Sequence, residues 1–295
     1  TAAATTSTVS LTNNGVKESV KSKVPLSIII DLDNLKLAPH RLLRSALGDV
    51  LCRSTCQVDW LTSHLLLNTE YDETPFALQY EDEKILLENS SKLLIGDYEA
   101  LAALSRMTLL NGIAAIIVGS THAGSMGEHL ISHYIDMFMG DKHPGTLHGE
   151  QVGVTTLLIS KIQNQIINYS DNLEFKKLKV TEEDFEKLFG NKIHTKMFKQ
   201  FQSKFFDNEK LNNVNNLLKT KWPDQRAILK KCLLPTDKIE KALKNCGAPT
   251  SNGELRIPNN FFNRAIQDSF LLRDRFSYLD VAHYTMTLGK YLIND

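Results

Sequence analysis

The spacing of apolar residues after Pro39 is the feature that most restricts what this chain can fold into. Apolar side chains recur at the helical interval in a series of segments, namely 41–67 (broken near Gly48), 81–94, 98–118, 152–169 and 259–292. The segment 98–118 is so rich in Leu, Ala and Ile that we expect it to be buried on most faces. Strand signals are almost absent from this part of the chain, so the sequence predicts a helical domain over 39–295.

One stretch before this region has the pattern of a strand. Residues 26–30 are apolar except for Ser27 and largely β-branched, and Asp31 and Asp33 close the run. Such a run is typical of a buried strand. A turn signal, Asn-Asn-Gly at 13–15, precedes it. We therefore expect residues 1–38 to form a short β segment.

The lysine-rich stretch 171–246 reads as amphipathic helices with a solvated face. Pro223 and Pro235 are expected to break these helices, because proline lacks an N–H and clashes with the preceding turn. None of the four cysteines forms a Cys-x-x-Cys pair. Cys52 and Cys56 are one helical turn apart and could meet a metal, but two thiols alone do not make a site. We expect all four cysteines to be buried, reduced and packed like small apolar groups.

The overall composition excludes some classes of function. Lys plus Arg and Asp plus Glu each number 34, so the formal net charge is zero, which argues against a nucleic-acid binder. No run approaches the roughly 20 consecutive apolar residues that cross a bilayer, and no signal peptide is visible. We therefore expect a cytoplasmic protein that binds neither nucleic acid nor membrane.

Histidine and glycine concentrate between residues 119 and 149. His129 and His133 are four residues apart in a predicted helix, so their imidazoles share one face. His148 follows after a loop, and Asp49 lies upstream, after a glycine expected to leave open space beside it. A carboxylate with two or three imidazoles is a ligand set for a divalent metal. Spacing alone leaves the alternative of surface or helix-capping histidines open.

Several motifs occur together in one order along the chain: Ser-Ala-Leu-Gly-Asp at 45–49, Asp-Trp at 59–60, Gly-Glu-His-Leu-Ile-Ser-His at 127–133 and His-Gly-Glu-Gln-Val-Gly-Val at 148–154. In this order they resemble the iron-containing alcohol dehydrogenase superfamily, and within it the glycerol-1-phosphate dehydrogenase branch. The stretches 25–33, 39–42 and 273–280 also resemble that branch. The resemblance implies the C-terminal helical domain of a dehydroquinate synthase-like fold, preceded by a β remnant of an N-terminal α/β domain.

The resemblance also implies roles for individual residues. It gives three ligands to a zinc or iron ion: Asp49, His129 and His148. It places His133 beside the metal as a catalytic residue that lines the nicotinamide and substrate site. Ser125 and Glu128 are implied at the lip of the metal pocket, in contact with substrate or behind the ligands.

The reaction implied is reversible hydride transfer between NAD or NADP and dihydroxyacetone phosphate, a step of phospholipid metabolism, with the metal polarising the carbonyl. Glycerol or another alcohol is an alternative substrate within the same superfamily. An alternative from a different class is a non-catalytic metal-binding or interaction protein. The residues around the metal do not align with those of the dehydroquinate synthase type. Lys142, Arg273 and Arg275 are cationic candidates for the substrate phosphate, but no phosphate site is assigned from the sequence.

The sequence departs from the family at its beginning. No strand–Gly-x-Gly–helix unit is found, and no acidic residue occurs before Glu18 where the family has one near the substrate. We therefore expect the nucleotide-binding half to be absent from this chain. It could have been cut away, lost or split off in the gene, or supplied by another chain. The expected partners are a small polyol phosphate, and either a second copy of this chain or a chain that supplies the missing domain.

Overall fold

The computed structural model describes residues 8–13, 16–191 and 193–294. Two strands pair as an antiparallel hairpin, β1 (Thr8–Asn13) and β2 (Val16–Lys21), with Asn13 opposite Val16. The α-helices follow in chain order as α1 (Leu32–Lys36), α2 (His40–Val50), α3 (Arg53–Leu67), α4 (Thr74–Asn89), α5 (Tyr98–Ile117), α6 (Gly127–Phe138), α7 (His148–Tyr169), α8 (Glu182–Phe189), α9 (His194–Gln202), α10 (Asn208–Cys232), α11 (Thr236–Asn245), α12 (Asn259–Asp268) and α13 (Tyr278–Tyr284). Short 3-10 helices complete the list: η2 (Ser90–Ile95), η3 (His122–Gly124), η4 (Gly140–Lys142), η5 (Ser269–Leu272) and η6 (Leu288–Tyr291).

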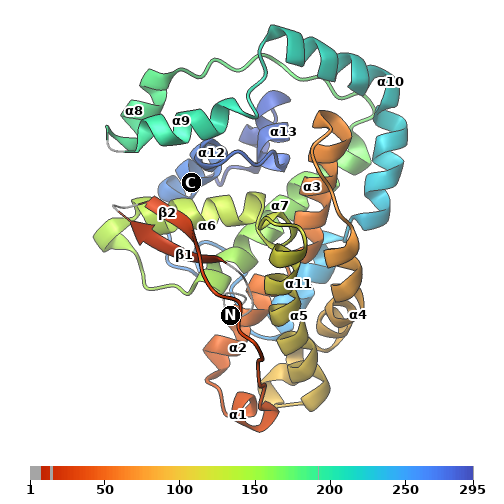
Figure 1. Cartoon of the computed structure of the whole chain (residues 1–295), viewed down its shortest axis with the longest axis vertical. Coiled ribbons are helices and arrows are strands. Elements are labelled where there is room, and N and C mark those ends of the chain that lie inside the picture. The colour runs from red at the N-terminus through yellow and green to blue at the C-terminus, as the bar shows by residue number, and fades with distance from the viewer. Residues whose placement is uncertain (1–7, 14–15, 192, 295) are drawn as a thin grey trace.

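Helix α7 is the central element of the fold. It is buried along most of its length and contacts α2, α3, α6, α10, α11 and α13. The other helices surround it, with α8 and α9 at one end of the molecule and α1 at the other (Figure 1). The β1–β2 hairpin lies against α6. The predicted mainly helical architecture is therefore confirmed.

Local sequence signals explain where several helices begin. The Asp97 side chain accepts a hydrogen bond from the Ala100 N–H at the start of α5, at 3.0 Å. Thr181 and Asp184 form a reciprocal capping box at α8, and Ser277 and Asp280 form another at α13. These side chains satisfy backbone N–H groups that have no partner inside the helix.

The predicted buried strand at 26–30 is wrong. These residues form no strand, and Leu26 and Ile29 are almost fully exposed. An apolar run becomes a buried strand only when neighbouring strands and a covering layer receive it. Within the described residues β1 and β2 pair only with each other, so the run has no sheet to join. The turn residues Asn14 and Gly15 lie outside the described residues, as do residues 1–7.

Only one of the two prolines in the lysine-rich region ends a helix as expected. Pro235 lies at the N-cap of α11, but Pro223 lies inside the 25-residue helix α10. An interior proline costs about 3 kcal/mol. Buried residues before and after Pro223, including Trp222 and Leu229, pack α10 against the core. This packing offsets the cost of the proline, so the helix continues through it.

Helix α5 is less buried than its composition suggested. Ala100, Leu104 and Met107 are buried, but Ile113 and Ile117 near its C-terminal end are exposed. By length and composition α5 could cross a membrane, and 39% of its tested 18-residue window is buried inside the protein. Helices in the cores of soluble proteins meet the same criterion, so the helix by itself decides nothing about a membrane.

The cysteines largely match expectation. Cys52, Cys56 and Cys246 are fully buried free thiols, whereas Cys232 is half-buried. Two of them, Cys52 and Cys56, lie at the start of α3, next to the predicted metal ligands.

Candidate metal centre

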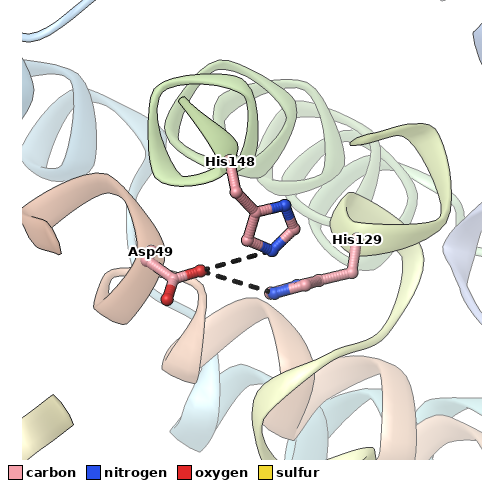
Figure 2. Close-up of side chains that lie close together, drawn as sticks. All are labelled: Asp49, His129 and His148. Carbon is pink, nitrogen blue, oxygen red and sulfur yellow. Dashed lines mark ion pairs between the residues drawn. The ribbon is translucent and has the colours of Figure 1, made fainter. Parts of the chain in front are cut away.

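The structure brings together the three predicted metal ligands from three helices. Asp49 lies near the end of α2, His129 in the first turn of α6, and His148 is the first residue of α7. Both imidazole Nε2 atoms point at one carboxylate oxygen, Asp49 Oδ1, from 3.6 Å for His129 and 3.7 Å for His148 (Figure 2). The candidate ligand atoms of the three residues all lie within 4.8 Å of one another.

These separations suit a shared metal ion better than hydrogen bonds. Two ligands about 2.1 Å from a tetrahedrally coordinated ion lie roughly 3.4 Å apart, whereas an N–H···O hydrogen bond is about 2.9 Å long. Asp49 Oδ1 is shielded from solvent and has no hydrogen-bond partner among the described residues. A buried carboxylate oxygen is stable only when it is paired or binds a cation. The residues present therefore fit a divalent metal.

A close helix crossing sets the distance between two of the ligands. Gly48 precedes Asp49 on α2 and Gly149 follows His148 on α7. A Cβ atom at either glycine would overlap the backbone of the other helix, with contacts well under 3.0 Å. The expectation of open space beside Gly48 is thus wrong. The glycine is needed because the α7 backbone occupies that space.

Glu128 lies behind His129 rather than at the lip of the pocket. It is fully buried, and its Oε1 accepts hydrogen bonds from His129 Nδ1 at 2.9 Å and from the Met126 N–H at 2.7 Å. Burial opposes its charge, but the interaction with His129 outweighs it and lowers the pKa of Glu128. An ionised carboxylate only accepts, so Nδ1 of His129 carries a hydrogen, and Nε2 is the nitrogen that can bind a metal.

A chain of polar side chains orients His148 in the same way. The amide of Gln151 donates to Asp136 Oδ1 and to Thr146 Oγ1, each at 3.0 Å, so its oxygen is the end that accepts from Ser132 Oγ, at 2.7 Å. Ser132 has a single hydrogen, and it is used in that bond. Ser132 therefore accepts from Nδ1 of His148 at 3.0 Å, and Nε2 of His148 is left as the ligand atom.

The electrostatics of the ligands are those of a site that attracts a cation. Burial favours the neutral acid of Asp49, but the imidazoles of His129 and His148 outweigh burial and lower its pKa. Burial also opposes a charge on His129, yet the neighbouring Asp49 and Glu128 raise its pKa well above the ordinary value. In the absence of metal, a proton on His129 thus balances the carboxylates.

His133 lies one turn beyond His129 on α6 and adjoins both histidine ligands. Its ring centroid is 6.0 Å from that of His129 and 5.9 Å from that of His148, and it is stacked with the latter. The side chain is partly exposed. The structure thus places His133 next to both histidine ligands, and its role in the reaction stays a prediction.

Ser125 is held by an arginine rather than directed at the metal. Arg275 donates to the backbone oxygen of Ser125, to its Oγ at 2.8 Å, and to Oγ1 of Thr121. Burial, and then the nearby Arg273, lower the pKa of Arg275 to about 10. Among the other phosphate candidates, Lys142 is exposed in η4.

Sequence reasoning missed the residues that support the ligands. Ser132 on α6 supports His148 on α7, and Gln151 acts on His148 only through Ser132, so spacing along the chain indicated neither role. The sequence also gave no role to Asp59. Its side chain is fully buried and accepts hydrogen bonds from the N–H groups of Gly127 and Tyr278, each at 3.1 Å. Asp59 thereby joins α3 to the start of α6, directly before His129.

Comparison with known proteins shows what the whole sequence is similar to. No family model matches the sequence. Curated relatives do match, among them glycerol-1-phosphate dehydrogenase (NAD(P)+) of Pyrococcus horikoshii, 31% identical over 166 residues. The enzyme of the same name from Methanothermobacter thermautotrophicus is 32% identical over 150 residues. The chain is similar to glycerol-1-phosphate dehydrogenases.

The extent of the match differs among these dehydrogenases. The Pyrococcus horikoshii alignment covers 56% of this chain and 45% of that relative. The glycerol-1-phosphate dehydrogenase of Halalkalibacterium halodurans aligns over 267 residues at 24% identity, covering 90% of this chain and 58% of the relative. The chain thus spans about half the length of the relatives it matches.

Proposed function

We propose that this chain is the metal-binding catalytic part of an NAD(P)-linked glycerol-1-phosphate dehydrogenase, with zinc or iron held by Asp49, His129 and His148. The observation that carries the proposal is the convergence of two oriented imidazoles on one unpartnered oxygen of Asp49. The similar proteins are named NAD(P)-linked dehydrogenases of glycerol 1-phosphate. For this chain we propose the corresponding reversible reaction, reduction of dihydroxyacetone phosphate to sn-glycerol 1-phosphate. Such an enzyme is expected in the cytoplasm and serves phospholipid metabolism.

A divalent ion at this site supplies Lewis acidity toward the substrate carbonyl. Asp49 lowers the charge of the bound ion, and Glu128 and Ser132 hold the two imidazoles in the required tautomers. His133, next to both histidines, is proposed to hold the proton that the product hydroxyl receives. Ser125, on the loop before α6, is proposed to contact substrate while Arg275 fixes its position. Glu128 is too deeply buried for substrate contact, so we propose for it the supporting role alone.

The nicotinamide cofactor, NAD or NADP, is proposed to bind mainly to a nucleotide-binding domain that is not among residues 1–295. Either the same gene product or a partner chain would supply it. The exposed end of α5 and the exposed run 26–30 leave apolar surface that is compatible with contact to such a domain or to a second copy.

The test is an NADH and NADPH oxidation assay of the full-length gene product with dihydroxyacetone phosphate and, in parallel, with dihydroxyacetone. Oxidation that depends on the phosphorylated substrate, is lost after chelation and returns with zinc or iron supports the proposal. Preference for dihydroxyacetone would instead indicate a glycerol dehydrogenase of the same superfamily. The variant His133→Gln should lose kcat while it keeps its metal.

A non-catalytic metal-binding protein is the second candidate. It is favoured by one observation: the described residues contain a single two-stranded hairpin and no parallel sheet of the kind that binds dinucleotides. A full-length protein that retains its metal but oxidises neither cofactor with either substrate would support this candidate over the enzyme.

A further inference from the structure

A second group of possible metal ligands, the inner group, lies around His129. Candidate ligand atoms of Cys52, Glu128 and His129 all lie within 4.8 Å of one another. All three side chains are buried, and the thiol and the carboxylate are fully so. The group shares one residue, His129, with the outer set of Asp49, His129 and His148.

Short contacts connect this inner group to its surroundings. The Cys52 thiol donates to the backbone oxygen of Asp49 at 3.0 Å, so it contacts a ligand residue of the outer set. The Cys56 thiol, one turn further along α3, donates to Glu128 Oε1 at 3.1 Å. Thr55 Oγ1 lies 3.3 Å from Glu128 Oε2. The inner group thus consists of a buried thiol, a buried carboxylate and a buried imidazole, and a second thiol, Cys56, contacts its carboxylate.

The two donor sets differ in chemical character. The outer set of one carboxylate and two imidazoles suits zinc or iron. The inner set contains sulfur, and thiolate ligands favour soft cations. A thiolate and a carboxylate carry two negative charges, which balance a divalent ion in a site where an unbalanced charge would be costly. Ligand atoms on a tetrahedral ion of this kind lie roughly 3.5 Å apart, so binding needs movements of only about 1 Å.

We propose that Cys52, Glu128 and His129 form a second cation position, specific for soft thiophilic divalent ions, that excludes occupation of the outer position. The exclusion follows because a neutral imidazole has a single lone pair, so His129 can ligate one ion at a time. The thiol proton of Cys52 leaves to water when the ion binds. Soft cations therefore displace the metal of the outer site instead of binding beside it. This mutual exclusion of the two positions rests on the proposed function, since it takes His129 as a ligand of the outer ion.

The test uses Cd²⁺ as the probe and the ultraviolet charge-transfer band of thiolate-bound cadmium as the signal. The wild-type chain should develop the band, which saturates at one Cd²⁺ per chain and declines when Zn²⁺ is added. Cys52→Ser should weaken Cd²⁺ binding by more than about 10-fold, the lower end of what a change next to a metal costs. Cys246→Ser is the matched control, because Cys246 is equally buried but lies in another part of the core, and it should keep the band.

Absence of the band in the wild type, or a band unchanged in Cys52→Ser, overturns the proposal. Simultaneous binding of one Zn²⁺ and one Cd²⁺ overturns the exclusion. If Cys52→Ser does not fold, ¹¹³Cd NMR of the wild-type chain decides, since a thiolate ligand gives a strongly deshielded resonance and an all-oxygen and nitrogen site does not. Asp49→Asn separates the two proposals: it should lose Zn²⁺ affinity and keep the Cd²⁺ band. If Asp49→Asn loses the Cd²⁺ band, the inner position is contradicted. If Asp49→Asn keeps its Zn²⁺ affinity, the outer position is contradicted.

Discussion

Gly48 and Gly149 meet where α2 crosses α7, and each is the chain neighbour of a proposed metal ligand, Asp49 or His148. No side chain fits at either position, because a Cβ would overlap the backbone of the other helix. The crossing thereby brings the carboxylate and the imidazole to the separation that an ion needs. The metal site thus depends on packing between helices as well as on the ligands themselves.

Gly149→Ala should move α7 away from α2 and change both stability and metal binding. The new Cβ would overlap the backbone of Ser45, and overpacking of this kind costs about 1–3 kcal/mol. We expect a lower free energy of unfolding in urea and a weaker affinity for Zn²⁺ in a competition assay. Gly289→Ala is the control, since a Cβ there meets nothing within 4 Å. Equal effects of the two substitutions would argue against the crossing as the cause.

Ser132→Ala should weaken the metal site while the protein remains folded. The substitution removes the acceptor for Nδ1 of His148, so the imidazole is free to change tautomer or rotate. The loss of such a supporting contact costs about 10–100-fold in metal affinity. Ser160→Ala removes another buried serine hydroxyl, bonded to Thr236, and should leave Zn²⁺ affinity unchanged. Unchanged affinity in Ser132→Ala would show that Ser132 does not orient His148.

Acid should destabilise the protein in part through His283. This imidazole stacks on Phe270, and burial lowers its pKa from 6.5 to about 4. The unfolded chain binds the proton more readily, so this contribution to stability is complete above about pH 6.5 and is lost as pH falls toward 4. Each pKa unit corresponds to about 1.4 kcal/mol, which gives a loss of about 3 kcal/mol over that window.

The measurement for this prediction is the free energy of unfolding as a function of pH. His283→Phe should flatten the curve between pH 6.5 and 4. His122, whose pKa burial also lowers to about 4, should continue to contribute in the same window. The exposed His40 offers the control His40→Gln, which should follow the wild-type curve. A wild-type slope in His283→Phe would assign the acid sensitivity to other groups.

Much of the helical architecture was predictable from the sequence, because amphipathic periodicity reports which face of a helix is buried. The segments that became α2, α6 and α12 are examples. Errors arose where tertiary contacts decide. The run 26–30 has the composition of a strand but no sheet to join among the described residues, and Pro223 lies inside α10 because packing on both sides outweighs its local cost.

The candidate site shows the same division. The ligand types and the helical spacing of His129 and His133 can be read along the chain. The position of Glu128 behind His129, instead of at the pocket lip, depends on how α3 and α6 pack. The partnership of Ser132 with His148 likewise joins two helices. Contacts between residues distant in sequence produce no periodic pattern in the sequence, so the supporting residues could be identified only from the structure.

The most direct test of the account is the metal content and Zn²⁺ affinity of the purified chain beside three single variants: Asp49→Asn, His129→Gln and His148→Gln. The wild type should bind one zinc or iron ion per chain. Each variant should lose more than about 10-fold in affinity, because it removes a ligand itself and not only a supporting contact. His40→Gln should bind as the wild type does. Full metal binding by any one of the three variants, in a protein that remains folded, would contradict the ligand assignment at that residue and with it the proposed metal centre.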